Sequence, residues 1–450
     1  MTLPREFVHL ESALAAASAA PRWFVAFSGG LDSTVLLHLL SRWQTGREAM
    51  PELCALHINH QLQDAAADWA EHCRVFCQGL GVPLRVLEAT VTLRGKGLEA
   101  AAREARYALL AGQLGPGEVL FTAHHLDDQV ETFFLRLLRG AGIEGLSAMP
   151  AQRALGKGSL VRPLLACSRE QLEDYARRHQ LPWVDDPSNA DPALDRNFLR
   201  REVLPRFGER WPAYRQAVAR AATHMAEARS RLLQGLPPVL EVASALGDPG
   251  IELTELLDQD PATAAALLRE WLRGLGCAAP DQSLLAEFLR QLRESSAEAN
   301  PLLDAGDYRL QRYRGSIYLL PEEGALPDGL TLVPGAGAVT VGGVGELALR
   351  PCAAGFCLRP GESVDLRWRR GGERCRPLGR SAGASLKQLA QEAGVPPWWR
   401  SRLPLVYLGD ELLAVGGLGS CHSSRSGATG EALEARWELY WNPAIQQPAD

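Results

Sequence analysis

The first group of residues that could do chemistry is a short loop with two adjacent glycines, Ser28-Gly29-Gly30-Leu31-Asp32-Ser33. Glycines let backbone amides approach a phosphate closely, and a helix that begins just after them presents its positive end to that phosphate. The hydroxyl groups of Ser28 and Ser33 can add hydrogen-bond donors. A carboxylate at Asp32 would repel phosphates unless a Mg²⁺ ion bridged the two. The loop therefore predicts a site for a metal-bound nucleotide; the alternative is a glycine turn with a Ser or Asp cap.

A second group combines two histidines with three acids, in the order His124, His125, Asp127, Asp128 and Glu131. Asp128 and Glu131 are three residues apart near the start of an expected helix, so they share one face of it. Capping of the positive helix N-terminus is a competing explanation for Asp127 and Asp128. Zinc binding by the two histidines is disfavoured, because adjacent residues of an extended segment point to opposite sides.

Arginines gather in three other places. Arg103 and Arg106 lie three apart on an expected helix, where a solvated basic face is the simpler explanation. A polar cluster around Phe198 suits a nucleic acid strand whose bases are splayed and stacked. Its other members are Arg196, Asn197, Arg200 and Arg201. From Arg359 to Arg402 the chain has ten Lys or Arg against four Asp or Glu, which favours contact with a polyanion over arginines that merely face water.

Strands followed by helices are expected to position these groups. An apolar run at 23–27 precedes the glycine loop and then apolar residues at helical spacing, which predicts strand, loop and helix. The pattern recurs with expected strands at 53–58, 82–87 and 119–123, each followed by a helix. Four such repeats predict an α/β fold in which helices cover both faces of a parallel sheet. Ligands of such sheets bind beyond the carboxyl ends of the strands, where the glycine loop and the acids fall.

Farther along the chain the pattern is less regular. Helices are expected at 169–180 and 215–232, and the Gly- and Pro-rich stretch 321–345 suggests a linker or a domain entrance. Short apolar runs such as 403–407 suggest a small mixed domain at the C-terminus. We therefore expect three domains, namely a nucleotide-binding catalytic domain at 1–215, a mainly helical middle domain at 216–335 and an α+β domain at 340–450.

Bulk properties limit the class of protein. The chain has 450 residues, more than one hydrophobic core usually covers, and 46% of them are hydrophobic. A net charge of -6 argues against a protein coated in nucleic acid over its whole surface. Nine cysteines without a Cys-x-x-Cys pair favour buried thiols over a disulfide framework or a zinc ribbon. With no export signal and no apolar run of membrane-spanning length, we expect a cytoplasmic protein that binds no membrane.

The glycine loop is similar to the PP-loop of the N-type ATP pyrophosphatases, which cleave ATP between its α and β phosphates. It lacks the Gly-Lys-Ser or Gly-Lys-Thr of the Walker type and the third glycine of the dinucleotide type. The segment 123–132 further resembles the second signature of the tRNA(Ile)-lysidine synthetases. Other matching blocks lie near both ends of the chain, at 57–60, 99–103, 137–142, 162–164, 184–189, 196–200, 371–377 and 404–407.

That resemblance implies an adenine nucleotide α-hydrolase-like fold and a reaction of ATP, with Mg²⁺, free L-lysine and an isoleucine tRNA whose anticodon is CAU. The O2 atom of the first anticodon cytidine would attack the α-phosphate of ATP and release pyrophosphate. The lysine amine would then attack C2 and displace AMP, giving lysidine, so the anticodon would read AUA instead of AUG. An amine with a pKa of about 10.4 arrives as an ammonium, so a carboxylate must hold it and help remove a proton.

The resemblance also implies roles for individual residues. Asp128 and Glu131 would bind the lysine ammonium, and Asp32 would bind the metal. The catalytic residues would be Asp32, Arg103, His124, Asp128 and Glu131. ATP would be bound by Ser28, Gly29, Gly30, Leu31, Asp32, Ser33 and His57. The tRNA would be bound by Arg196, Asn197, Arg200, Arg201, Arg369, Arg370, Arg374, Arg376 and Arg380.

Two other functions stay open at this point. A tRNA sulfur transferase would use the same ATP-activating fold, but such enzymes commonly need paired cysteines, and the chain has no Cys-x-x-Cys pair. A non-catalytic RNA-binding protein would keep the fold without turnover, and the intact Asp32, Asp128 and Glu131 argue against it. The sequence does not determine the oligomeric state, for which a homodimer is one option.

Overall fold

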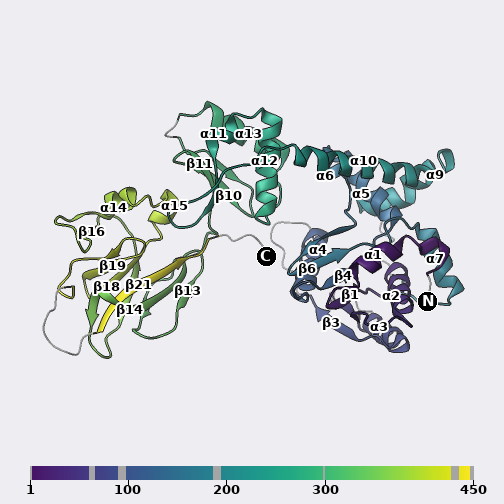
Figure 1. Cartoon of the computed structure of the whole chain (residues 1–450), viewed down its shortest axis with the longest axis horizontal. Helices are drawn as coiled ribbons and strands as arrows, with labels where there is room; N and C mark the ends of the chain where they lie inside the picture. Colours follow the sequence, from purple (N-terminus) through teal and green to yellow (C-terminus); the bar gives the residue numbers. More distant parts are fainter. Residues whose placement is uncertain are drawn as a thin grey trace. The chain divides into compact units, whose positions relative to one another are not determined.

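The structure, a computed structural model, describes residues 3–59, 66–89, 98–185, 194–296, 299–426 and 435–445. The chain divides into two compact units at Gly235 and Leu236 (Figure 1). Each unit has hydrophobic clusters of its own, as expected of separate folded bodies. Within the described ranges, no helix combines the length and the apolar character needed to cross a bilayer.

A six-stranded sheet forms the centre of the first unit, in the order β3-β2-β1-β4-β6-β5. Neighbouring strands are parallel except for the antiparallel pair β5 and β6. The strands are β1 (Arg22–Ala26), β2 (Glu52–Asn59), β3 (Leu84–Glu88), β4 (Val119–Phe121), β5 (Gln152–Leu155) and β6 (Gly158–Val161). The four predicted strands are thus confirmed. The sequence did not predict the hairpin of β5 and β6, because each strand has only 4 residues and β5 is largely exposed.

Helices pack on both faces of this sheet, as predicted. Trp23 and Val25 of β1 join a cluster with residues of the helices α1, α2 and α7, whereas Phe24 joins a cluster with Leu110 of α4. Alternate residues of a strand point to opposite faces, so both faces are buried. The helices are α1 (Leu10–Ala17), α2 (Leu31–Gln44), α3 (Ala66–Leu80), α4 (Leu98–Gly112) and α7 (Arg169–Arg178).

A helical extension completes the first unit. Its elements are α5 (Leu126–Leu138), α6 (Ile143–Leu146), α8 (Asp195–Phe198), a π-helical turn (Leu199–Val203), α9 (Leu204–Arg210) and α10 (Tyr214–Gln234). Val130 of α5 packs with Leu204 and Tyr214 in a small separate core. Because of this packing α10 belongs to the first unit, whereas we predicted a domain boundary at 215.

The second unit begins with a five-stranded antiparallel sheet, in the order β7-β8-β11-β10-β9. Its elements are β7 (Glu241–Ala243), β8 (Pro249–Glu252), α11 (Leu253–Leu257), α12 (Pro261–Gly274), α13 (Gln282–Glu294), β9 (Leu302–Asp304), β10 (Arg309–Tyr313) and β11 (Ser316–Leu319). Ile251 and Ile317 of the sheet pack against Leu268 and Phe288 of the helices. Helices hold more residues than strands here, as predicted, but the sheet itself escapes prediction because its strands are so short.

The rest of the second unit is the expected small domain of mixed α and β structure. A five-stranded antiparallel sheet, β12-β15-β18-β19-β20, packs against a three-stranded one, β13-β14-β21, through Phe356 and Val406. The strands are β12 (Leu330–Leu332), β13 (Val339–Val341), β14 (Gly345–Leu358), β15 (Val364–Trp368), β16 (Arg374–Cys375), β17 (Ala384–Ser385), β18 (Pro404–Leu408), β19 (Glu411–Val415), β20 (Gly419–Ser420) and β21 (Ala435–Pro443). The helices are α14 (Leu386–Glu392) and α15 (Pro397–Arg400).

The cysteines differ in one respect from the prediction of free thiols. Cys375 and Cys421 form a disulfide, with their Cα atoms 5.8 Å apart. The two residues are separated by 46 positions in the sequence, and spacing alone does not reveal such a pair. The other seven cysteines are free, and five of them are buried.

Candidate active site

The glycine loop lies between β1 and α2, at the carboxyl edge of the parallel sheet. Gly29 has a positive φ of 81°, and a Cβ atom there would lie 2.9 Å from the Sγ atom of Cys73, so only glycine fits. The hydroxyl of Ser33 donates to the carbonyl of Gly30 at 3.0 Å and accepts from the backbone N–H of Ser28 at 3.2 Å. The loop is therefore held by its own hydrogen bonds.

His57 at the end of β2 lies directly behind this loop. Its Nδ1 atom is 3.0 Å from the carbonyl oxygen of Phe27, the residue before Ser28. Burial lowers the pKa of His57, so the ring is neutral near pH 7. This contact supports the backbone that leads into the loop, and ATP binding by His57 stays a prediction. His60 lies outside the described residues.

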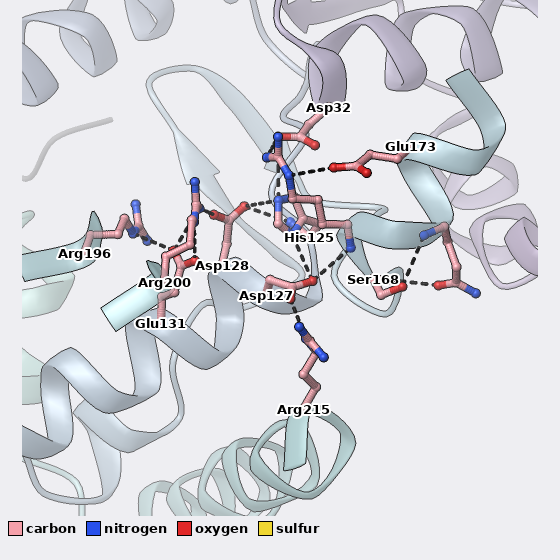
Figure 2. A network of polar contacts seen from close by, with 12 residues as sticks. Asp32, His125, Asp127, Asp128, Glu131, Ser168, Glu173, Arg196, Arg200 and Arg215 are labelled. Atoms are coloured by element: carbon pink, nitrogen blue, oxygen red, sulfur yellow. Dashed lines mark hydrogen bonds and ion pairs between the residues drawn. The ribbon is translucent and has the colours of Figure 1, made fainter. Parts of the chain in front are cut away.

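Asp32 belongs to a cluster of acids around His125 (Figure 2). The Nε2 atom of His125 is 3.6 Å from Asp32 and 3.5 Å from Asp128, and its Nδ1 atom is 3.7 Å from Asp127. The ring is 1% exposed. Burial acts to lower the pKa of His125, but the charges of Asp128 and Asp32 outweigh it and raise this pKa. His125 therefore links the glycine loop to the acids of α5.

His124, the histidine predicted to be catalytic, has its Nδ1 atom 2.9 Å from the hydroxyl of Thr122. The charge of Asp128 acts on its ring as well as on that of His125. Burial lowers the pKa of His124 to about 4, so its ring is neutral near pH 7. The opposite directions of adjacent residues on extended backbone were a usable signal, but they did not tell which histidine faces the acids.

Asp127 has a structural role. Its carboxylate accepts a hydrogen bond from the backbone N–H of Arg169 at 2.9 Å, at the first turn of α7. The Nε atom of Arg215 donates to the same carboxylate at 2.5 Å, which fixes the start of α10 beside α5 (Figure 2). Arg169 also places its Nη1 atom 3.5 Å from Asp32. Neither arginine had a sequence signal, because both contacts join residues far apart in the chain.

Asp128 and Glu131 converge, as their spacing predicted, but an arginine lies between them (Figure 2). The Nε and Nη2 atoms of Arg200 donate to Glu131 at 2.6 and 3.0 Å, and Nη2 also donates to Asp128 at 3.3 Å. The Nε atom of Arg196 lies 3.1 Å from Glu131. Asp128 also accepts the backbone N–H of His125 at 3.1 Å, so the capping explanation holds for it as well.

The two carboxyl groups differ in their electrostatics. Glu131 is fully buried, and burial raises its pKa despite the hydrogen bonds from Arg200. Burial acts in the same direction on Asp128, but the electrostatic effects of His125 and Arg196 outweigh it, so the pKa of Asp128 is lowered. The site therefore keeps at least one carboxylate ionised near neutral pH.

The remaining residues assigned to the reaction or to tRNA lie in different settings. Arg103 is exposed on α4, with its guanidinium 5.4 Å from the ring centre of Tyr107, and no described contact joins it to the acids. In the cluster around Phe198, Asn197 is buried and Arg201 is exposed. Arg369 is mostly buried and bonded within its own domain. The other four arginines of the second unit that were predicted to bind tRNA are exposed, namely Arg370, Arg374, Arg376 and Arg380.

The residues around Asp32 fit a magnesium ion in one respect. The Oδ1 atom of Asp32 is buried and has no hydrogen-bond partner within the structure. A carboxylate oxygen of this kind is what Mg²⁺ prefers in nucleotide sites, where phosphates and water supply the other ligands. In the described part of the chain, no three His, Cys, Asp or Glu side chains are arranged to hold a metal by themselves.

A parallel sheet with a glycine loop at its carboxyl edge defines the first unit as a PP-loop domain. In agreement, residues 5–207 match the family model described as the PP-loop domain. Residues 252–318 match the TilS substrate binding domain, and 364–441 match the TilS substrate C-terminal domain.

Curated relatives cover nearly the whole chain. The tRNA(Ile)-lysidine synthase of Pseudomonas aeruginosa is 43% identical over 463 residues, which is 98% of this chain and 99% of the relative. The enzyme of the same name from Serratia proteamaculans is 41% identical over 93% of this chain and 94% of its own length. The chain belongs to the tRNA(Ile)-lysidine synthase family.

Proposed function

We propose that the protein joins free L-lysine to C2 of the first anticodon cytidine of an isoleucine tRNA with a CAU anticodon, consuming ATP. The observation that carries the proposal is the link from the glycine loop through His125 to Asp128 and the neighbouring Glu131. This link joins the loop that we propose binds the phosphates to the acids that we propose bind the ammonium. The relatives named for this activity support the same reaction.

In the first step the O2 atom of cytidine attacks the α-phosphate of ATP, and pyrophosphate leaves. The backbone of the glycine loop would hold the phosphates, and Asp32 would hold a Mg²⁺ ion, which supplies positive charge against them. Positioning and charge neutralisation dominate such transfers, and fixed orientation alone is worth about 7 to 11 kcal/mol. A loop held by its own hydrogen bonds suits that task.

In the second step the lysine amine attacks C2, loses a proton, and displaces AMP, which leaves with the O2 atom. Asp128 and Glu131 would bind the ammonium before that proton is lost. Arg200 lies between these carboxylates, so the lysine must share or displace the contacts of this guanidinium. The reaction needs no membrane, and a cytoplasmic location is part of the proposal.

A sulfur-transfer reaction is less well supported. Cys73 and Cys167, the cysteines nearest the loop and α7, are buried, and burial raises the pKa of each to about 12. Such thiols are not nucleophiles near pH 7, because the thiolate is the reactive form.

Mass spectrometry of the anticodon nucleoside tests the proposal, after incubation of the protein with tRNA transcript, ATP and lysine. We expect lysidine only when all three substrates are present, and pyrophosphate release that requires tRNA but not lysine. A thiolated nucleoside would point to sulfur transfer. Binding of tRNA without pyrophosphate release would point to a non-catalytic RNA-binding protein.

A further inference from the structure

Arg169, at the start of α7, is a cation beside the glycine loop that neither step of the proposed reaction uses. Its Nη1 atom is 3.5 Å from the Oδ2 atom of Asp32, and its Nε atom donates to Glu173 at 3.3 Å. Glu173 lies one helical turn further along α7. The side chain of Arg169 is 37% exposed, so the guanidinium meets both Asp32 and the solvent that a nucleotide would displace.

The backbone of Arg169 is fixed, whereas its side chain is not. The backbone N–H donates to Asp127 at 2.9 Å. Ser168 caps α7 just before it, because its hydroxyl accepts the N–H of Gln171 at 3.3 Å and the Gln171 side chain accepts the N–H of Ser168 at 2.8 Å. The two contacts of the guanidinium are longer than the about 2.7 to 2.9 Å of a charge-assisted hydrogen bond. The guanidinium can therefore change partner while the helix stays in place.

A nucleotide bound to the loop changes the charges that Arg169 meets. Asp32 keeps a buried oxygen, Oδ1, without a hydrogen-bond partner, and it is this oxygen that fits a Mg²⁺ ion. A Mg²⁺ ion on Asp32 cancels the negative charge that attracts Arg169, and the phosphates of ATP bring new negative charge to the same place. A guanidinium matches phosphate oxygens with two parallel hydrogen bonds, which favours arginine at such sites.

The position of Arg169 distinguishes between the phosphates. In Figure 2, Asp128 and Glu173 lie on opposite sides of His125, and Glu131 lies on the Asp128 side. The α-phosphate must lie toward Asp128 and Glu131, because the cytidine and the lysine react there in the proposed function. Arg169 is bonded to Glu173 on the opposite side, which leaves it to the β and γ phosphates.

We infer that Arg169 binds the β and γ phosphates of ATP, exchanging its contact with Asp32 for them when the metal nucleotide enters. As the bond between cytidine O2 and the α-phosphorus forms, the bond from that phosphorus to the bridging oxygen breaks. Its electron pair leaves with pyrophosphate, whose growing charge the guanidinium neutralises. The inference rests on the proposed function and deepens it, since it adds a substrate-binding residue to the first step. Glu173 is a positioning residue that keeps the guanidinium beside the loop.

Calorimetric titration of the full chain tests this assignment, with Mg²⁺ present and with pyrophosphate, ATP and AMP as the three ligands. We expect Arg169→Ala to weaken binding of pyrophosphate and ATP about 10- to 100-fold, the effect of losing one charge-assisted contact. AMP lacks the β and γ phosphates, so its affinity should not change. Equal weakening of AMP and pyrophosphate would contradict the assignment to these phosphates, and unchanged pyrophosphate binding would overturn the inference.

Arg169→Lys keeps the charge beside Asp32 but not the paired hydrogen bonds, so it should recover part of the lost affinity. It also replaces Arg169→Ala in case the alanine variant does not fold. In that case it should still weaken pyrophosphate more than AMP. A lysine variant that binds all three ligands like the wild type would show that the charge alone suffices, and the paired contact with phosphate oxygens would be wrong.

Arg177→Ala is the matched control. Arg177 lies on the same helix and also contacts Glu173, with its Nη2 atom at 3.5 Å, but its side chain is 69% exposed. It is about 12 Å from Arg169 along the helix axis. This variant removes the same charge from α7 and should leave the three affinities unchanged. A loss equal to that of Arg169→Ala would show that the net charge of α7 acts, and not a contact with phosphate.

The exchange of partners is tested without metal, in the presence of a chelator. Asp32→Asn should then increase the affinity for pyrophosphate, because Asp32 no longer competes for Arg169. Part of the gain comes from removing a negative charge near the ligand. That part should persist in the Arg169→Ala background and the rest should be lost, so the gain should be smaller there. A gain of equal size in both backgrounds would overturn the exchange.

Failure of the inference and failure of the proposed function give different results, because the titrations contain neither RNA nor lysine. If the wild type makes lysidine but Arg169→Ala binds pyrophosphate normally, the inference alone is wrong. If Arg169→Ala loses pyrophosphate binding but the wild type makes no lysidine, the proposed reaction is wrong and the phosphate contact of Arg169 stands.

Discussion

At the residue scale, the four acids of the candidate site have different contacts. Asp127 is bonded to the first turn of α7 and to Arg215, which makes it part of the scaffold. Asp32 keeps a buried oxygen without a partner. Asp128 and Glu131 share Arg200. This division follows from the long-range partners that each carboxylate meets, and it is consistent with our proposal that different acids serve the two steps of the reaction.

Replacing Asp32 by alanine should abolish the first step. We expect pyrophosphate release to fall about 100-fold or more, because charge stabilisation by a bound metal is worth several kcal/mol. Affinity for tRNA should stay within a few fold. Filter binding and a pyrophosphate assay measure the two quantities on one preparation. Asp32→Asn, which keeps the shape of the side chain but removes its charge, is the control. Adenylation at a near-normal rate in the alanine variant would remove Asp32 from the metal site.

Replacing Glu131 by alanine should slow the second step more than the first. Without this charge-assisted hydrogen bond to the ammonium, lysine transfer should slow at least about tenfold, so adenylated tRNA accumulates. Rapid quenching followed by nucleoside analysis measures both species. Because Glu131 also accepts a hydrogen bond from Arg200, the variant Glu131→Gln is measured alongside Glu131→Ala. Its amide oxygen still accepts that hydrogen bond but carries no charge. Equal slowing of both steps in the two variants would make Glu131 structural.

At the element scale, the parts that sequence reasoning predicted are those with regular local patterns. The run at 23–27 and the glycines after it predicted β1, the loop and α2, and the spacing of Asp128 and Glu131 predicted their common face. The contact of Arg200 with Glu131 spans 69 residues and has no local pattern. The same holds for the contacts of His125 with Asp32 and Asp128, because both histidines fit a strand end.

A fully buried carboxylate joins two parts of the second unit. Asp248, between β7 and β8, accepts hydrogen bonds from the indole N–H groups of Trp398 and Trp399 at 3.1 and 2.9 Å. The hydroxyl of Ser244 donates to it at 2.5 Å. Burial raises the pKa of Asp248 even so, since the hydrogen bonds offset only part of the cost of burying its charge. Asp248 thus ties the first sheet of this unit to α15.

Replacing Asp248 by alanine should destabilise the second unit. We expect a decrease in stability of about 1 to 3 kcal/mol for each indole N–H left buried without a partner, measured by chemical denaturation. Because the folded-state pKa is raised, the folded state binds a proton more tightly than the unfolded state. Lowering the pH from 7 toward 4 should therefore stabilise the wild type relative to Asp248→Asn, which cannot titrate. A difference that is constant over this range would contradict the raised pKa.

At the scale of the whole molecule, the boundary at Gly235 changes how tRNA binding by the second unit is tested. A truncation at 340 would cut through one compact unit and remove β15, the partner of β12. Weaker tRNA binding would then report unfolding as readily as the removal of tRNA-binding side chains. Point substitutions in the full chain avoid this ambiguity.

The exposed arginines of the second unit should hold tRNA phosphates. Arg370 and Arg376 are exposed near β16, whereas the partly buried Arg369 is bonded to the carbonyl oxygen of Arg400. The double variant Arg370→Ala, Arg376→Ala should weaken tRNA binding and lower the salt slope by roughly 1.4 to 1.8, or 0.7 to 0.9 for each phosphate that is no longer neutralised. ATP binding by the first unit should be unaffected.

The matched control for this prediction is the double variant Arg5→Ala, Arg47→Ala, which removes two exposed arginines of the first unit from outside the candidate site. Its salt slope should equal that of the wild type. Both variants carry the same change in net charge, so long-range attraction to the polyanion falls equally in each. An equal slope in the two double variants would mean that the second unit holds tRNA without these arginines, through its shape or through other side chains.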